Sequence, residues 1–152
     1  MIRPQRDWEG EDRMLPENIK QFASETHRGV LTTFRRNGAA QMSIISCGPL
    51  RDGICFTVTE DRVKLKNLRR DPRCTLLVSQ ENWRPFVVLE GRAQIISADN
   101  TGPEELRMAL REAYSACSGE DHPDWAEYDQ AMLDDRRSVI IVVPDHVYGT
   151  VS

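Results

Sequence analysis

The sequence lacks the motifs that mark the common nucleotide-binding folds and metal sites. It contains neither G-x-G-x-x-G nor G-x-x-x-x-G-K-[ST], which excludes a Rossmann fingerprint and a P-loop, so a bound phosphate would need other donors. The four cysteines show no C-x-x-C spacing and the three histidines are scattered, so neither a zinc site nor a redox dithiol is indicated. We expect no metal, and cysteines that are buried and reduced.

Long hydrophobic runs and a strong excess of charge are also missing. The longest apolar run, residues 139–143, is far shorter than the roughly 20 residues of a membrane-spanning helix. The 20 basic and 24 acidic residues give a net charge of −4, which argues against nucleic acid as the main partner. Nothing near residue 1 is typical of a secretion signal. We therefore expect a cytoplasmic protein with neither a membrane nor a nucleic-acid partner.

The length of 152 residues favours a single domain. Residues 1–14 are polar and charged and are expected to form a flexible tail, which leaves residues 15–152 as the folded domain. Apolar residues at helical spacing predict a helix over residues 15–28 and two further helices, acidic on the outside, over 103–117 and 123–133.

Short β-rich segments separated by turns predict a mainly β protein with peripheral helices. Residues 30–34 and 40–47 flank Asn37-Gly38, which is the strongest short signal for a β-hairpin. Gly91 suggests a bulge in a strand over 83–96, and Pro85 suggests that this strand lies at an edge. The remaining strands are expected at 54–59, 74–78, 138–143 and 147–151, a spacing that favours a small antiparallel barrel.

The most informative stretch is residues 57–72, where a strand leads directly into a cationic helix. Residues 62–73 hold six Lys or Arg and one acid, and the start of a helix presents unpaired N–H groups to an anion. A solvated basic helix is the alternative. The side chains that could hold a phosphate are a guanidinium, an ammonium, an amide and two strand hydroxyls, from Arg62, Lys64, Asn67, Thr57 and Thr59.

No residue is singled out as catalytic. Ser43 lacks the G-x-S-x-G context of a hydrolase nucleophile. Glu90 is better explained by an ion pair at a strand edge, and His146 by a structural contact with Tyr148, than by proton transfer. Trp83 is read as a core or interface aromatic, or as a contact for a ring-shaped ligand.

Five segments together resemble the pyridoxamine-phosphate-oxidase-like split-barrel family, and within it the branch that binds the deazaflavin coenzyme F420. The resemblance extends from about Gly29 to Gly149. The segments are Val30-Leu31-Thr32-Thr33, the basic stretch 62–73, Leu89-Glu90-Gly91, His122-Pro123-Asp124-Trp125 and His146-Val147-Tyr148-Gly149.

The resemblance implies a homodimer of six-stranded antiparallel split barrels with the cofactors in grooves between the subunits. The protein would be an oxidoreductase in which reduced F420 transfers a hydride to a small electron-poor substrate. The implied phosphate contacts are Arg62, Lys64 and Asn67, with Thr57 and Thr59 adjacent, and the implied ring contacts are Met42, Ser43, Ile44 and Trp83, the last from either subunit.

Two alternatives to an F420-dependent reductase stay open. A phosphate site does not distinguish F420 from FMN, so an FMN-binding flavoprotein of the same family is one of them. The other is a non-enzymatic protein that binds or carries a cofactor. Oxidation of pyridoxamine phosphate itself is not expected, because the chain ends in His146 to Ser152 without the Arg-containing tail of those oxidases.

Overall fold

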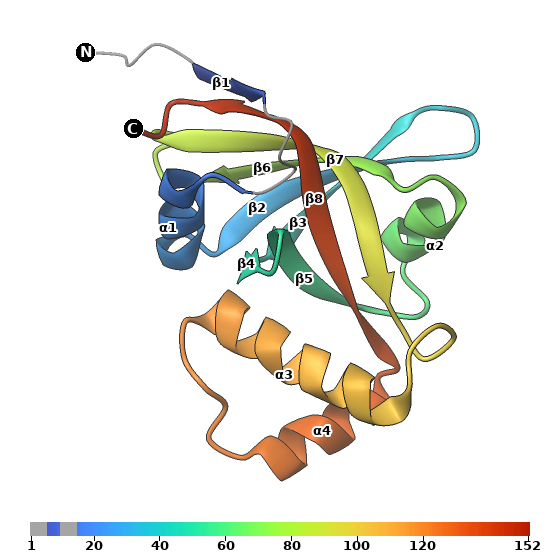
Figure 1. Cartoon of the computed structure of the whole chain (residues 1–152). Helices are drawn as coiled ribbons and strands as arrows, with labels where there is room; N and C mark the ends of the chain where they lie inside the picture. The colour runs from blue at the N-terminus through green and yellow to red at the C-terminus, as the bar shows by residue number, and fades with distance from the viewer. Residues whose placement is uncertain (1–5, 10–14) are drawn as a thin grey trace.

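The computed structural model describes residues 6–9 and 15–152, which form a curled antiparallel sheet with helices around it (Figure 1). The sheet order is β3-β2-β6-β7-β8-β5-β4, and β1 pairs with β8. The strands are β1 (Arg6–Glu9), β2 (Arg28–Phe34), β3 (Ala40–Ser46), β4 (Gly48–Leu50), β5 (Gly53–Thr59), β6 (Arg73–Ser79), β7 (Phe86–Ile96) and β8 (Arg137–Gly149).

The predicted mainly β split barrel is confirmed, with more strands than expected. Among the described residues there are eight strands where six were predicted, and six of the eight have seven residues or more. The two additional strands, β1 and β4, have only four and three residues. The hairpin at Asn37-Gly38 is confirmed by the pairing of β2 with β3.

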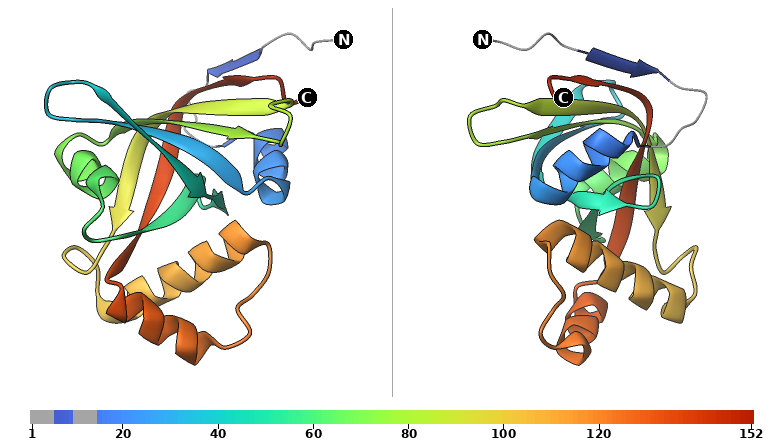
Figure 2. Two further views of the ribbon diagram at one scale, coloured as in Figure 1. Left: turned by 180° about the vertical axis from the view of Figure 1, so that it is seen from behind. Right: turned by 60° about the vertical axis from the view of Figure 1, so that its left-hand side comes forward.

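Four helices cover the described part of the sheet: α1 (Glu17–Glu25), α2 (Val63–Arg70), α3 (Pro103–Ser118) and α4 (Trp125–Asp134). Both α3 and α4 lie at one end of the sheet, with α4 on the far side of α3 (Figure 2). The first helix is shorter than the predicted 15–28, because the chain has already entered β2 at Arg28. None of these helices is long and apolar enough to cross a membrane.

One long strand, β8, replaces the two strands predicted around Pro144. It pairs with β7 along its length, with β5 over its first half and with β1 over its last residues. The register shift expected at Gly91 is present, between Glu90 and Gly91 opposite Pro144. A bulge at this position accommodates a proline, which has no N–H for the ladder, so the strand continues through it.

The edge position predicted for β7 is wrong, because β6 and β8 pair with its two sides. Pro85 lies before Phe86, the first residue of the strand, and is joined to Arg84 by a cis peptide bond. A proline outside the ladder removes no sheet hydrogen bond, so it does not restrict the strand to an edge.

The predicted tail, residues 1–14, lies mostly outside the described residues. Within it, β1 pairs antiparallel with β8, from Arg6 opposite Gly149 to Glu9 opposite His146. Residues 1–5 and 10–14 are not described. The flexibility of the tail therefore stays a prediction.

The sheet separates two hydrophobic cores. Inside the barrel, Phe56 of β5 and Ile140 of β8 pack with side chains from α1 and α2. On the opposite face of the same two strands, Cys55 and Ile141 pack under α3 together with Leu110. The run 139–143 is continuously apolar because successive residues of a strand point to opposite faces, and here both faces are largely covered.

A close backbone approach at Gly48 fixes α3 against the sheet. A Cβ atom at this position would lie 1.9 Å from the carbonyl oxygen of Ala116 and 2.9 Å from the nitrogen of Cys117, both in α3. Neither atom belongs to a flexible side chain. Any side chain at position 48 would therefore push α3 away from β4.

We expect Gly48→Ala to lower the free energy of unfolding by about 1–3 kcal/mol, the usual cost of overpacking a buried contact. The measurement is urea denaturation followed by circular dichroism. Gly102→Ala is the matched control, because a Cβ there meets no atom within 4 Å. Since Gly102 caps α3, the control should lose less than about 1 kcal/mol. Equal losses in the two variants would contradict the role of Gly48.

Candidate functional site

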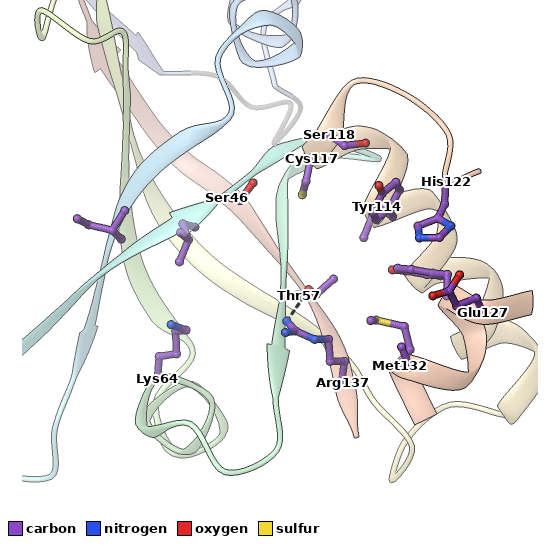
Figure 3. A pocket seen from close by; sticks show the side chains of 15 residues that line it. Ser46, Thr57, Lys64, Tyr114, Cys117, Ser118, His122, Glu127, Met132 and Arg137 are labelled. Atoms are coloured by element: carbon purple, nitrogen blue, oxygen red, sulfur yellow. Dashed lines mark hydrogen bonds between the residues drawn. The ribbon is translucent and has the colours of Figure 1, made fainter. Parts of the chain in front are cut away.

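A pocket of about 550 Å³ lies between the sheet and the two helices α3 and α4 (Figure 3). This volume is in the range of small-molecule sites, about 300–1,000 Å³. One wall comes from β3, β5, α2 and the start of β8, and the other from the helices. The lining residues are Ile44, Ile45, Ser46, Thr57, Lys64, Ala113, Tyr114, Cys117, Ser118, His122, Glu127, Tyr128, Ala131, Met132 and Arg137.

Two cations, Lys64 and Arg137, belong to the barrel side of the pocket, with the Thr57 hydroxyl beside Arg137 (Figure 3). Arg137 Nη1 donates a hydrogen bond of 3.1 Å to Thr57 Oγ1. Its Nε is buried without a hydrogen bond, and the nearest Asp135 carboxylate oxygen is 3.6 Å away. The guanidinium is thus ion-paired with Asp135, and its remaining N–H groups are the ones available to an anion in the pocket.

Lys64 is held in the pocket by the helix that carries it. Its neighbours Leu65 and Leu68 are buried in the barrel core, which leaves the half-buried Lys64 side chain on the pocket side of α2. No carboxylate pairs with Lys64 in the described part of the chain. Burial, followed by the nearby charges of Arg62 and Arg137, lowers the pKa of Lys64. The folded protein therefore holds an ammonium that an anion would stabilise.

The N-terminus of α2 adds to the positive character of this side. Its N-cap residue, Arg62, makes no side-chain capping hydrogen bond. The first backbone N–H groups that find a carbonyl within the helix are those of Leu65 and Lys66, which share the carbonyl of Arg62. The preceding N–H groups and the helix dipole favour an anion at this end.

The helix side of the pocket is aromatic. The ring centroids of Tyr114 and His122 are 4.9 Å apart, and those of His122 and Tyr128 are 5.4 Å apart. Tyr128 is buried and its hydroxyl donates a 2.6 Å hydrogen bond to the carbonyl of Leu110. Burial also raises the pKa of Tyr128, so this hydroxyl keeps its proton and serves to join α4 to α3.

Ion pairs hold α4 on α3. Asp129 of α4 accepts hydrogen bonds of 3.0 and 2.6 Å from Arg111 of α3, and the Arg111 guanidinium lies 5.2 Å from the Trp125 ring centroid. The hydrogen bonds from Arg111 lower the pKa of Asp129. The aromatic wall is thus fixed by contacts between the two helices, and Tyr128 also packs in one core with Cys55 and Ile141 of the barrel strands.

A second cavity, of about 560 Å³, lies between α3, α4 and the β5–α2 loop. Arg137 and Met132 line both cavities. The cations of the second cavity are largely neutralised, since Arg69 pairs with Glu60, and Arg107 pairs with Glu104. The first pocket is therefore the better site for an anion.

Three of the residues predicted to bind a cofactor line the first pocket, namely Thr57, Lys64 and Ile44. They come from β5, α2 and β3, so the fold does bring the predicted strand and helix start together. Their roles in cofactor binding stay predictions.

The other predicted phosphate contacts do not line the pocket. Asn67 is buried, donates a 3.1 Å hydrogen bond to Thr33 and accepts one from Arg70, so it joins α2 to β2. Thr59 donates to Asp61 at the start of the loop. Arg62 is exposed at the N-cap and acts on the pocket through its charge.

The remaining predicted ring contacts lie on the surface or within the barrel wall. Met42 and Trp83 are 62% and 63% exposed and do not line the pocket. Ser43 is half-buried on β3, opposite Leu31. Contacts of these three residues with a cofactor stay predictions.

Sequence reasoning missed the helix side of the pocket and Arg137. Tyr114, His122 and Glu127 are distant in sequence from the basic stretch, and their helices were read only as acidic covers. The clustering of His122 and Trp125 around Pro123 was the one available signal. Arg137 belongs to a late run that also resembles the F420-binding branch, but it was not assigned to the site, because nothing in its local sequence places it beside Thr57.

Comparison with known proteins gives one family. Residues 15–150 match the family model described as pyridoxamine 5'-phosphate oxidase. A conserved hypothetical protein from Mycobacterium tuberculosis is similar in structure, with a TM-score of 0.72 and 20% identity, over 94% of this chain and 89% of that one.

Two further structures carry functional names. A protein named F420 reductase gives a TM-score of 0.59 and 20% identity, over 88% of this chain and 98% of that one. A heme storage protein from Vibrio cholerae gives a TM-score of 0.60 and 13% identity, over 86% of this chain and 90% of that one. At such identities the similarity shows the fold alone.

The thiols provide a test of the pocket. Burial raises the pKa of Cys47 and of Cys74 to about 12, and the contact with Cys117 together with burial raises that of Cys55. Cys117 is half-buried and lines the pocket. Because the thiolate is the nucleophile, we expect iodoacetamide at pH 8 to modify Cys117 alone in the native protein.

Peptide mass spectrometry after a timed reaction is the measurement, and Cys117→Ser is the control that should abolish native labelling. All four thiols should react once the protein is denatured. Equal rates at Cys74 and Cys117 in the native state would show that the pocket does not provide the only access to a thiol.

Proposed function

This chain belongs to the pyridoxamine 5'-phosphate oxidase family, and on that basis we propose that it is an oxidoreductase that binds coenzyme F420 in the pocket under α3. Reduced F420, when bound, supplies a hydride to a small electron-poor substrate. The observation that carries the proposal is the pair Lys64 and Arg137, two incompletely compensated cations beside a hydroxyl in a pocket of about 550 Å³.

The donor set fits an anionic group. An ammonium, a guanidinium and the hydroxyls of Thr57 and Ser46 are groups that bind phosphate or carboxylate oxygens. The apolar and aromatic remainder of the lining suits a flat ring. In this proposal Lys64 and Arg137 hold the anionic part of the cofactor, while α3 and α4 shield the site from water.

We further propose that the protein is a homodimer that uses the outer face of β2 and β3. Met42 and Ile44 are 62% and 75% exposed on this face, and their cross-strand neighbours are Thr32 and Val30. Such a cluster of exposed apolar side chains is typical of an interaction surface. Because Ile44 also lines the pocket, a second subunit on this face would border the cofactor site.

Two alternatives are supported by specific observations. An FMN-binding flavoprotein is favoured by the family itself, and FMN carries a phosphate that the same cations could hold. A carrier without catalytic activity is favoured by the heme storage protein among the similar structures. The three candidates differ in the ligand that binds and in whether bound reduced cofactor is oxidised.

Comparative titration of F420 and FMN into the purified protein tests the proposal, with fluorescence as the readout. We expect saturable binding of F420 that is tighter than binding of FMN. Lys64→Ala should weaken F420 binding by about 1.5–3 kcal/mol, the contribution of a hydrogen bond to a charged group. Lys66→Ala is the matched control, because Lys66 is an exposed lysine on the same helix.

Equal affinities in the two variants would remove Lys64 from the binding site. Protein that purifies yellow and releases FMN on denaturation would favour the FMN alternative. Saturable F420 binding without oxidation of the reduced cofactor by any enone or quinone would favour the carrier.

A further inference from the structure

His122 lies in the loop before α4, with its ring in the aromatic wall of the pocket, opposite Lys64 (Figure 3). The ring is half-buried and contacts the rings of Tyr114 and Tyr128. The proposed anion site on the barrel side does not involve it. The structure nevertheless determines which of its nitrogens carries a proton.

The backbone N–H of Asp124 points at His122 Nδ1 across 2.9 Å. A backbone amide can only donate, so Nδ1 must accept and carries no proton while this hydrogen bond exists. The neutral imidazole then has its one proton on Nε2. Within residues 15–152, the His122 side chain makes this hydrogen bond through Nδ1 and none through Nε2.

Most other donors on the helix side are already used. The hydroxyl of Tyr128 donates to Leu110, that of Ser118 donates to Glu120, and the Cys117 thiol points at the carbonyl of Cys55. The Nε2–H of His122 therefore remains available to a molecule in the pocket, together with the hydroxyl of Tyr114.

We propose that His122, fixed as the Nε2–H tautomer, donates a hydrogen bond to a neutral acceptor oxygen of the substrate. This inference rests on the proposed function and identifies the substrate as a flat compound with a carbonyl conjugated to the reacting carbon. When that carbon accepts a hydride, an electron pair moves to the carbonyl oxygen, and Nε2–H stabilises the developing negative charge. The proton that completes the reduction comes from water.

His122 does not act as the acid in this proposal. Loss of the Nε2 proton from the neutral ring would leave an imidazolate, and a protonated ring would break the hydrogen bond from Asp124. A neutral donor also complements a neutral oxygen, whereas the cations on the other wall suit an anion. In this proposal the helix side binds the neutral oxygen of the substrate, and the barrel side binds the anionic group.

Two variants separate this role from a structural one. In His122→Asn the side-chain oxygen can still accept from Asp124 N–H, at the position of Nδ1, but no donor reaches the position of Nε2. In His122→Gln the amide N–H₂ reaches the position of Nε2, while the contact with Asp124 is lost. A purely structural histidine would tolerate Asn better than Gln, and the proposal predicts the reverse order for ligand binding.

The probe is 1-indanone, a flat ketone that does not alkylate thiols, and indane is its matched control without the oxygen. Chemical-shift titration by NMR gives both affinities, in the cofactor-free protein and in the protein saturated with F420. We expect His122→Asn to weaken binding of 1-indanone about three- to tenfold, as for one neutral hydrogen bond. The affinity of His122→Gln for 1-indanone should lie within about twofold of that of the unsubstituted protein. The affinity for indane should differ by less than about twofold among the three proteins.

Nitrogen-15 NMR of the imidazole should show an unprotonated Nδ1, and urea denaturation should show that both variants are folded. The proposal would be overturned by a protonated Nδ1, by equal losses of 1-indanone affinity in His122→Asn and His122→Gln, or by a lack of 1-indanone binding to the unsubstituted protein. F420 titration is scored separately. Loss of F420 binding with the ketone result intact would overturn the proposed cofactor and leave His122 in its role.

Discussion

The burial of β8 on both faces is the constraint on which the rest of the molecule depends. Val142 and Ile140 point into the barrel, while Val139 and Ile141 point under α3. Each fully buried side chain of this kind contributes about 1.5–3 kcal/mol. The same strand hydrogen-bonds to β7, β5 and β1, so it fixes the sheet and the helical layer in one element. The first residue of this strand, Arg137, is therefore held at the junction of barrel and helices.

The position of Arg137 explains why the pocket is cationic although the chain is acidic. Its neighbour Asp135 is too far from Nε for a hydrogen bond, and Lys64 has no carboxylate within its described surroundings. Of the acidic residues of α3 and α4, Glu104 and Asp129 are paired with Arg107 and Arg111 of the same helices, while Glu127 lines the pocket. The barrel side of the pocket thus carries two cations, Lys64 and Arg137, of which Arg137 is paired with Asp135. Burial, and to a smaller extent the charges of Arg62 and Arg137, lowers the pKa of Lys64.

The sequence was sufficient for the elements that follow from local periodicity. Alternation in β5, the Asn37-Gly38 hairpin and the cationic start of α2 were all predicted, because each depends on neighbouring residues. Errors arose where tertiary pairing decided the outcome: Pro144 lies within a continuous strand because a bulge accommodates it, and β7 is central despite Pro85. In the site, Asn67 had the right chemistry but faces Thr33. The residues on the helix side of the pocket were missed because α3 packs against strands that are separated from it by up to about half of the chain.

The two walls of the pocket depend on different parts of the structure. Lys64 and Thr57 belong to elements whose apolar side chains fill the barrel core, so the cationic wall is as rigid as that core. His122 is placed by the N-terminal turn of α4, which is joined to α3 through Asp129 and Tyr128. Substitutions in α4 can therefore alter the aromatic wall without touching Lys64, whereas Arg137 is coupled to this helix through its ion pair with the C-cap residue Asp135. In the proposed function the barrel side would hold the anionic part of the cofactor and the helix side the neutral substrate, so changes in the helices would act first on the choice of substrate.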